Sequence, residues 1–123
     1  MEFIINEKLP SLNELINANR HNRFKGAKMK EEIDDIISLY IMQARARGDI
    51  EPIDQPCIIF IDWHERTKKR DVDNIQSSQK FILDALQKTG IILNDNQRYV
   101  RQIYHEVIQD KSDYVKVRIE VIE

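Results

Sequence analysis

Apolar positions recur at helical spacing in one long stretch of the chain, with charged residues between them. These positions are Ile33, Ile36, Ile37, Tyr40, Ile41 and Ala44. Gly48 follows the stretch, where a left-handed cap is expected. We therefore predict a helix from about Lys28 to Arg47.

A second helical pattern covers residues 75–88. Asp73 or Asn74 can cap its first turn, and Gly90 follows its end. Residues 10–27, in contrast, have no clear period and contain four asparagines. We expect an ordered loop or a broken helical turn there.

Four shorter stretches have the composition of strands. Residues 3–5 and 57–61 are apolar runs rich in β-branched and aromatic residues, and residues 99–108 can form a third strand. In residues 115–121, valine and isoleucine alternate with charged residues, which predicts a half-exposed strand. Residues 109–113 would then be the hairpin turn between the last two strands.

The resulting order, β-α-β-α-β-β, predicts an α+β fold with two helices packed on a small mixed β-sheet. A length of 123 residues, 41% of them hydrophobic, fits one domain over residues 1–123. The apolar runs are too short to span a membrane, and no basic segment precedes an apolar block at the N-terminus. We therefore expect a cytoplasmic protein. One cysteine, Cys57, excludes an internal disulfide and any multi-cysteine zinc site.

Charge is distributed unevenly, although the net charge is only −2. Two stretches that contain no acidic residue hold nine of the 19 lysines and arginines. The first comprises Arg20, Arg23, Lys25, Lys28 and Lys30, and the second comprises Arg66, Lys68, Lys69 and Arg70. Taken alone, each stretch is explained equally well as a solvated loop.

The second basic stretch leads directly into two aspartates, Asp71 and Asp73. If the backbone there is extended, both side chains point to the same side, where they repel each other unless a cation lies between them. Carboxylate oxygens suit Mg²⁺, and Asp95 can join the pair if the chain returns past the helix start. Such a site fits phosphodiester hydrolysis by a metal-activated water, with the basic residues holding the flanking phosphates.

Simpler explanations of the same residues stay open. Asp73 can be only a helix cap, and Asp71 can merely balance the basic residues before it. Trp63 and Phe24 can stack on bases, although core packing or shielding is the more frequent role of such residues. The spacing after Asp71 does not fit an EF-hand, and the chain has no glycine-rich phosphate loop, so no nucleotide cofactor is expected.

Several short motifs follow one another along the chain: Arg70-Asp71-Val72-Asp73-Asn74, Leu83-Asp84-Ala85-Leu86, Gly90-Ile91 and Asn94-Asp95, preceded by Pro10-Ser11-x-Asn13 and the stretch Arg20 to Lys30. In this order they resemble the RusA family of Holliday-junction resolvases, often carried by phages and prophages, although the two motifs before Arg70 match more weakly. The match spans roughly residues 10–97. It implies a Mg²⁺-dependent endonuclease, with Mn²⁺ as an alternative ion, that acts on branched DNA in recombination and repair in a bacterial or phage-infected cell. The resemblance also implies a homodimer that nicks two strands of a four-way junction symmetrically.

The family's metal carboxylates correspond to Asp71, Asp73 and Asp95, and its DNA contacts to the two basic stretches. Further candidates are the amides Asn13, Asn74 and Asn94. Two departures from the family pattern matter. Asn94 stands where the family has the first acid of a pair. The position of the family's catalytic lysine falls on Ser77 when it is counted forward from Asp73, but on Lys80 when it is counted back from Asp84. The two counts differ because the segment between Asp73 and Asp84 is three residues longer here than in the family. We take Lys80 as the candidate, with an exposed helix lysine as the alternative.

Three other functions compete with a junction resolvase. A related nuclease could cut other branched or flapped DNA. A DNA-binding module that has lost catalysis would explain Asn94 and the displaced lysine. A structural domain would use its aspartates only to cap helices and to pair with basic residues.

Overall fold

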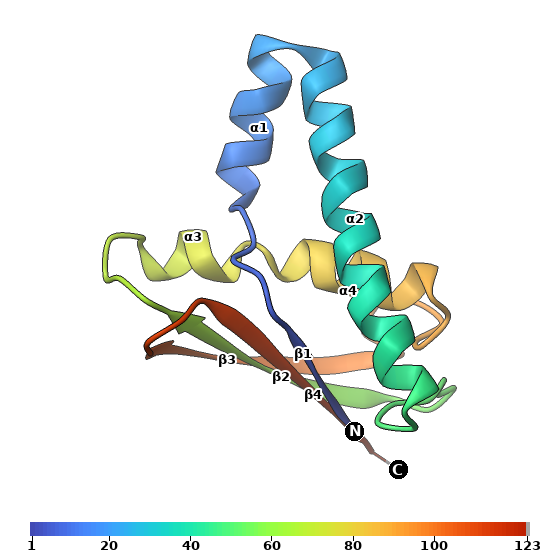
Figure 1. Ribbon diagram of the computed structural model, residues 1–123. Helices are drawn as coiled ribbons and strands as arrows, with labels where there is room; N and C mark the ends of the chain where they lie inside the picture. The colour runs from blue at the N-terminus through green and yellow to red at the C-terminus, as the bar shows by residue number, and fades with distance from the viewer. Residues whose placement is uncertain (123) are drawn as a thin grey trace.

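The computed structural model describes residues 1–122 as four strands and four helical segments (Figure 1). In chain order these are β1 (Glu2–Ile5), α1 (Leu12–His21), α2 (Arg23–Ala46), β2 (Cys57–Glu65), α3 (Val72–Gln76), α4 (Gln79–Lys88), β3 (Val100–Gln109) and β4 (Tyr114–Val121). The predicted α+β class is confirmed. Within residues 1–122, no helix has both the length and the apolar character needed to span a membrane.

The strands form one mixed sheet in the order β1-β4-β2-β3. β2 runs parallel to β3 and antiparallel to β4, which in turn is antiparallel to β1. The predicted hairpin between the last two strands is therefore wrong, because β2 lies between β3 and β4. The helical segments α3 and α4 carry the chain back along the sheet before β3 begins. This crossover makes β2 and β3 parallel and leaves the other edge of β2 for β4.

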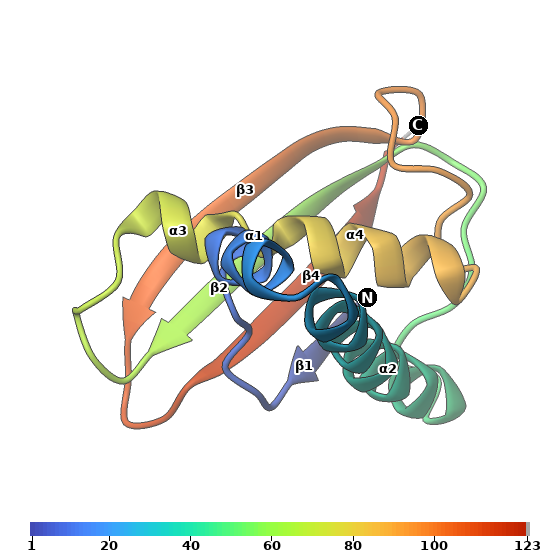
Figure 2. The ribbon, with the colours of Figure 1, turned by 90° about the horizontal axis from the view of Figure 1, so that it is seen from above.

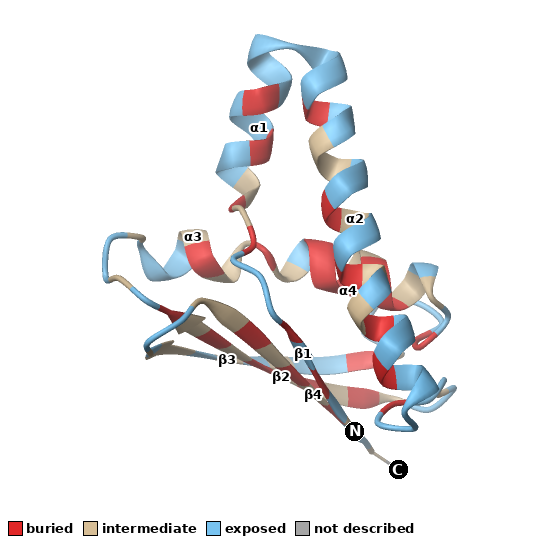
Figure 3. Cartoon of the chain, viewed as in Figure 1, coloured by how far each residue is buried: buried red, intermediate tan, exposed pale blue. Residues whose placement is uncertain are grey.

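All the helices lie on one face of the sheet (Figures 1 and 2). Side chains alternate along β2, so Ile61 and Trp63 are buried under the helices, where Ile37 of α2 is also fully buried. Figure 3 shows this burial on the sides of the helices that face the sheet. The opposite face has no helical cover and carries the stacked rings of Phe60 and Tyr104.

Two polar side chains cap the N-termini of the first two helices. The Ser11 hydroxyl accepts a hydrogen bond from the Glu14 backbone N–H at 3.2 Å and caps α1. Asn22 ends α1 and caps α2, since its Oδ1 accepts from the backbone N–H groups of Phe24 and Lys25 at 2.9 and 3.3 Å. The asparagine and serine in this region therefore set helix boundaries, which is a preferred use of these residue types.

The loop predicted over residues 10–27 is thus mostly helical. α1 has no strong sequence pattern because only Leu15 and Ala18 on it are buried. α2 begins at Arg23 rather than near Lys28, because its first turns belong to a hairpin with α1 and do not reach the sheet (Figure 1). Its end, at Ala46, agrees with the prediction to within one residue.

The predicted second helix is divided at Ser77 and Ser78. The Ser77 hydroxyl donates to the Asn74 carbonyl oxygen at 2.6 Å and accepts from the Leu12 N–H at 3.1 Å. The Ser78 hydroxyl donates to the Pro10 carbonyl oxygen at 2.7 Å. The junction between α3 and α4 is therefore fastened to the start of α1.

Candidate active site

Asp71 and Asp73 lie at the beginning of α3. Asp71 is the N-cap residue, with an extended backbone (φ −67°, ψ 148°), and its side chain makes no capping hydrogen bond. Asp73 follows in the first turn, and both residues are exposed. The alternative that Asp73 is the helix cap is wrong, because Asp71 occupies that position. The oxygens of Asp71 are not used in capping, and the helix start favours negative charge at both residues.

The backbone just before Asp71 is held by Arg70. The Arg70 guanidinium donates to both carboxylate oxygens of Glu65, at 2.9 Å each, and to the Leu9 carbonyl oxygen at 3.0 Å. The side chains of Arg70 and Glu65 are only 16% and 8% exposed. Arg70 therefore closes the loop between β2 and α3, although the charge pattern placed it among the DNA contacts. The sequence pattern did not single out Glu65, the last residue of β2.

Lys80 lies beside Asp95, the third candidate carboxylate. The Lys80 ammonium is 3.8 Å from Asp95 and 3.0 Å from Asp84. The hydrogen bond that Lys80 donates to Asp84 is the largest cause that raises the pKa of Lys80, the charge of Asp84 adds to it, and Asp95 contributes less. The break between α3 and α4 falls between Asp73 and Lys80, and Lys80 lies on α4.

Asp84 links this lysine to α2. Its carboxylate lies 3.6 Å from the Lys30 ammonium, which also binds Asp34 at 3.2 Å. Lys30, predicted to contact DNA, is thus already paired with two carboxylates. Asp84 had no predicted role, although its spacing of four from Lys80 is the signal for an ion pair on one helix face.

The three candidate amides support the loops around the aspartates. The Asn13 amide donates to Asn74 Oδ1 at 2.9 Å and so ties α1 to α3 beside Asp73. Asn94 Oδ1 accepts from the Asn96 N–H at 2.9 Å. This hydrogen bond folds the turn that presents Asp95.

The donor chemistry of Asp71, Asp73 and Asp95 suits a hard divalent cation. Their arrangement does not form a ready-made site, because within residues 1–122 no three side chains of the types His, Cys, Asp and Glu are grouped closely enough to hold a metal ion. The structure brings Asp95 together with Lys80, and it places Asp71 and Asp73 on the neighbouring helical segment, α3.

Three partly or fully buried side chains form a chain of hydrogen bonds close to Asp95. Trp63 Nε1 donates to His105 Nδ1 at 2.9 Å, so His105 Nε2 carries the hydrogen that is donated to Gln79 Oε1, also at 2.9 Å. Burial lowers the pKa of His105 and favours this neutral form. Gln79, His105, Asp95 and Arg101 line an open hollow. The sequence pattern identified neither Gln79 nor Arg101.

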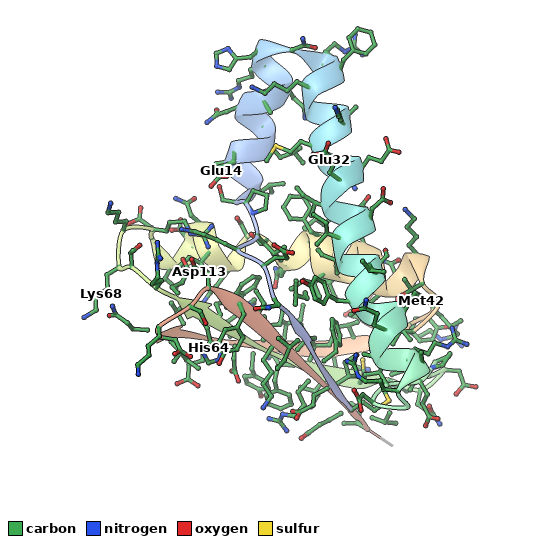
Figure 4. All side chains as sticks on the ribbon, in the orientation of Figure 1. Glu14, Glu32, Met42, His64, Lys68 and Asp113 are labelled. Carbon is green, nitrogen blue, oxygen red and sulfur yellow. The ribbon has the colours of Figure 1, made fainter. Side chains whose placement is uncertain are left out.

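The two predicted basic stretches occupy separate projections. Arg20, Arg23, Lys25 and Lys28 lie on the hairpin formed by α1 and α2, whereas Arg66, Lys68 and Lys69 lie on the loop before α3. Figure 4 labels Lys68 in this loop, and α3 lies between it and the base of the hairpin. In residues 1–122, the three cations of the loop form no ion pair.

Comparison with known proteins agrees with this arrangement of motifs. The family model described as endodeoxyribonuclease RusA matches residues 8–121. No curated protein sequence gives a match. The matched range includes every candidate site residue and both basic stretches.

Proposed function

Because this chain belongs to the endodeoxyribonuclease RusA family, we propose that it is a divalent-metal-dependent nuclease that resolves four-way DNA junctions by paired symmetric nicks. Membership itself implies a nuclease and, in general, Holliday-junction resolvase activity. The observation that supports an active enzyme is the contact between Lys80 and Asp95 at 3.8 Å. Because Lys80 also pairs with Asp84, this contact brings the motif that contains Asp84 and the motif that contains Asp95 into one charged group.

In this proposal, Asp71, Asp73 and Asp95 would hold Mg²⁺, or Mn²⁺ in its place. The bound ion would polarise the scissile phosphate and lower the pKa of a water molecule. Lys80, kept protonated by Asp84, stabilises the negative charge that develops on the phosphate. Arg70 contributes indirectly, because its ion pair with Glu65 fixes the backbone that presents Asp71.

DNA would be held by the two basic projections. The hairpin cations Arg20, Arg23, Lys25 and Lys28 and the loop cations Arg66, Lys68 and Lys69 would bind phosphates and set the orientation of the arms. A four-way junction has near two-fold symmetry, which is the reason to propose a homodimer with one site for each cut strand. Light scattering of the purified protein, alone and with a junction, would test this. A complex whose mass corresponds to one protein chain per junction would contradict the homodimer.

A second candidate is a branched-DNA-binding protein that does not cut. Asn94 removes one charge from the family's acidic pair, and the three aspartates are not assembled into a metal site in the described chain. These two observations favour this candidate, and it differs from the first only in catalysis.

Cleavage of an end-labelled four-way junction decides between the two. Wild-type protein and Asp71→Asn would be compared in Mg²⁺ and in EDTA, with linear duplex and a flap as control substrates. We expect paired symmetric nicks that need Mg²⁺ and are lost in the variant. Binding of the junction without cutting, in both Mg²⁺ and Mn²⁺, would contradict the nuclease and support the binding protein. Equal cutting of the flap would instead indicate a broader branch nuclease.

A further inference from the structure

Phe24 is the second residue of α2 and belongs to the turn between α1 and α2, which we call the hairpin tip (residues 19–28). Its side chain is 88% exposed, more than any other large apolar side chain in residues 1–122. The tip carries Arg20, Arg23, Lys25 and Lys28 and no acidic residue. Glu14 and Glu32, labelled in Figure 4, lie further down the hairpin toward the sheet. An aromatic ring is thus presented to solvent among cations.

Two features support the backbone of the hairpin tip. The Asn22 side chain caps α2 through the Phe24 and Lys25 N–H groups. Gly26 is buried against Asn19, and a Cβ at this position would overlap the Asn19 amide and come within 3.0 Å of the Asn19 Cα. The two helices therefore meet closely at their tip. Because the backbone N–H of Phe24 is already bound, docking of the ring orders its side chain but not this part of the backbone.

We propose that Phe24 stacks on a base that is exposed at the branch point of the DNA, while the cations of the hairpin tip bind the adjoining phosphates. The inference rests on the proposed function, since it names the feature by which the same protein would select branched DNA. Every base has a flat face on which an aromatic ring can stack. In linear duplex these faces are covered by neighbouring base pairs, and opening a step costs free energy. At a branch point, stacking is interrupted, so the ring gains a contact that linear duplex does not offer.

Charge and burial favour DNA over other partners of this ring. Among residues 1–122, Arg20, Arg23 and Lys25 form no ion pair, and Lys28 has only a weak one, at 4.0 Å, with the exposed Glu32. Two such tips from two copies of the chain would repel each other. Trp63, the other aromatic residue considered for base stacking, is only 2% exposed and lies in the core. Phe24 alone of the two can reach a base.

The test is equilibrium binding in EDTA, where no cutting occurs, to a four-way junction and to a linear duplex of the same length. Loss of one stacking contact in Phe24→Ala should weaken junction binding about tenfold and leave duplex binding unchanged. Phe24→Trp should keep junction affinity. Leu39→Ala, which removes another exposed apolar side chain of α2, is the matched control and should bind both DNAs as wild type does. A 2-aminopurine base at the branch point should change fluorescence on binding wild type but not Phe24→Ala.

Equal weakening of junction and duplex binding by Phe24→Ala would overturn the inference, as would an unchanged junction affinity. If wild type is a dimer and Phe24→Ala is not, the ring contacts a second copy of the chain, and the inference is overturned. The inference is also overturned if wild type but not Phe24→Ala binds anionic phospholipid vesicles while the two proteins bind DNA equally. A different result would contradict the proposed function. Wild type that binds the junction but never cuts it in Mg²⁺ contradicts the nuclease, while the comparison of Phe24→Ala with wild type still decides the role of the ring.

Discussion

The Lys80 ammonium lies 3.8 Å from the Asp95 carboxylate, although most of α4 and the turn after it separate the two residues along the chain. The hydrogen bond that Lys80 donates to Asp84, together with the charge of Asp84, raises the pKa of Lys80, so this side chain is protonated at neutral pH. A cation held beside a candidate metal ligand is in a suitable place to stabilise charge on a phosphate. Two predictions follow from this contact.

Replacing Lys80 with methionine removes the charge and keeps most of the side-chain bulk. We expect the single-turnover rate of junction cleavage to fall by about 10²- to 10³-fold, with little change in junction affinity measured in EDTA. Lys88→Met is the matched control, because Lys88 lies at the other end of α4 and, among residues 1–122, pairs only with the exposed Asp35. Cleavage by Lys80→Met at the wild-type rate would show that Lys80 is an ordinary surface lysine.

Asp84 is expected to act on cleavage through Lys80. Because Asp84 raises the pKa of Lys80, Asp84→Asn should lower it, and the protonated lysine should be lost at a lower pH. The rate of cleavage should therefore begin to fall on the alkaline side at a lower pH in Asp84→Asn than in wild type. A pH profile of kcat/KM measures this shift. If the variant were slower by the same factor at every pH, the role of Asp84 would be structural only.

Arg70 and Lys69 are neighbours in the chain, but we expect Arg70 to stabilise the fold and Lys69 to contact DNA. Arg70→Met leaves the buried Glu65 carboxylate unpaired and should destabilise the fold by about 3 kcal/mol, as judged by urea unfolding. Lys69→Met should leave stability unchanged and lower the slope of log K against log salt for DNA binding by about 0.9, the value for one lost phosphate contact. A stable Arg70→Met variant with the reduced salt slope would instead place Arg70 on the DNA.

His105 should make the folded protein sensitive to mild acid. Burial lowers its pKa in the folded state, whereas the unfolded chain takes up a proton near its ordinary pKa of about 6.5. The unfolded state then binds more protons, so the free energy of unfolding should decrease as the pH falls below about 7. His105→Gln should show a smaller decrease between about pH 7.5 and 5.5. His21→Gln, at an exposed position of the hairpin, should keep the wild-type dependence, and equal slopes for all three proteins would refute the assignment.

Local patterns in the sequence were sufficient where neighbouring residues decide the structure. The spacing from Ile33 to Ala44 predicted the main helix, and α2 contains it. α1 was missed because only Leu15 and Ala18 on it are buried, so its position depends on α2 rather than on its own periodicity.

Strand neighbours and long-range ion pairs could not be predicted in the same way. The last two strands looked like a hairpin because they are close in sequence, but β2 separates them through contacts that no short segment contains. The candidate site shows the same limit. Its aspartates stand in motifs, whereas the contact of Asp95 with Lys80 joins two segments that are far apart along the chain.

Asn94 offers a test of the metal site through a gain of function. The Asn94 side chain accepts a hydrogen bond from the Asn96 N–H through Oδ1, and an aspartate can accept the same bond, so Asn94→Asp should preserve the turn. The added carboxylate stands next to Asp95 and restores the acidic pair of the family. We expect half-maximal cleavage at a lower Mg²⁺ concentration, by about tenfold if the added charge contributes about 1.4 kcal/mol to binding of the ion. The midpoint of thermal unfolding should likewise respond to lower Mg²⁺ in the variant than in wild type, because an ion that binds only the folded state stabilises it.

Asn96→Asp, which adds a charge in the same turn at a position outside the family's pair, is the control and should leave the Mg²⁺ requirement nearly unchanged. If Asn94→Asp and wild type needed the same Mg²⁺ concentration in both measurements, the turn that carries Asp95 would not contribute to the metal site.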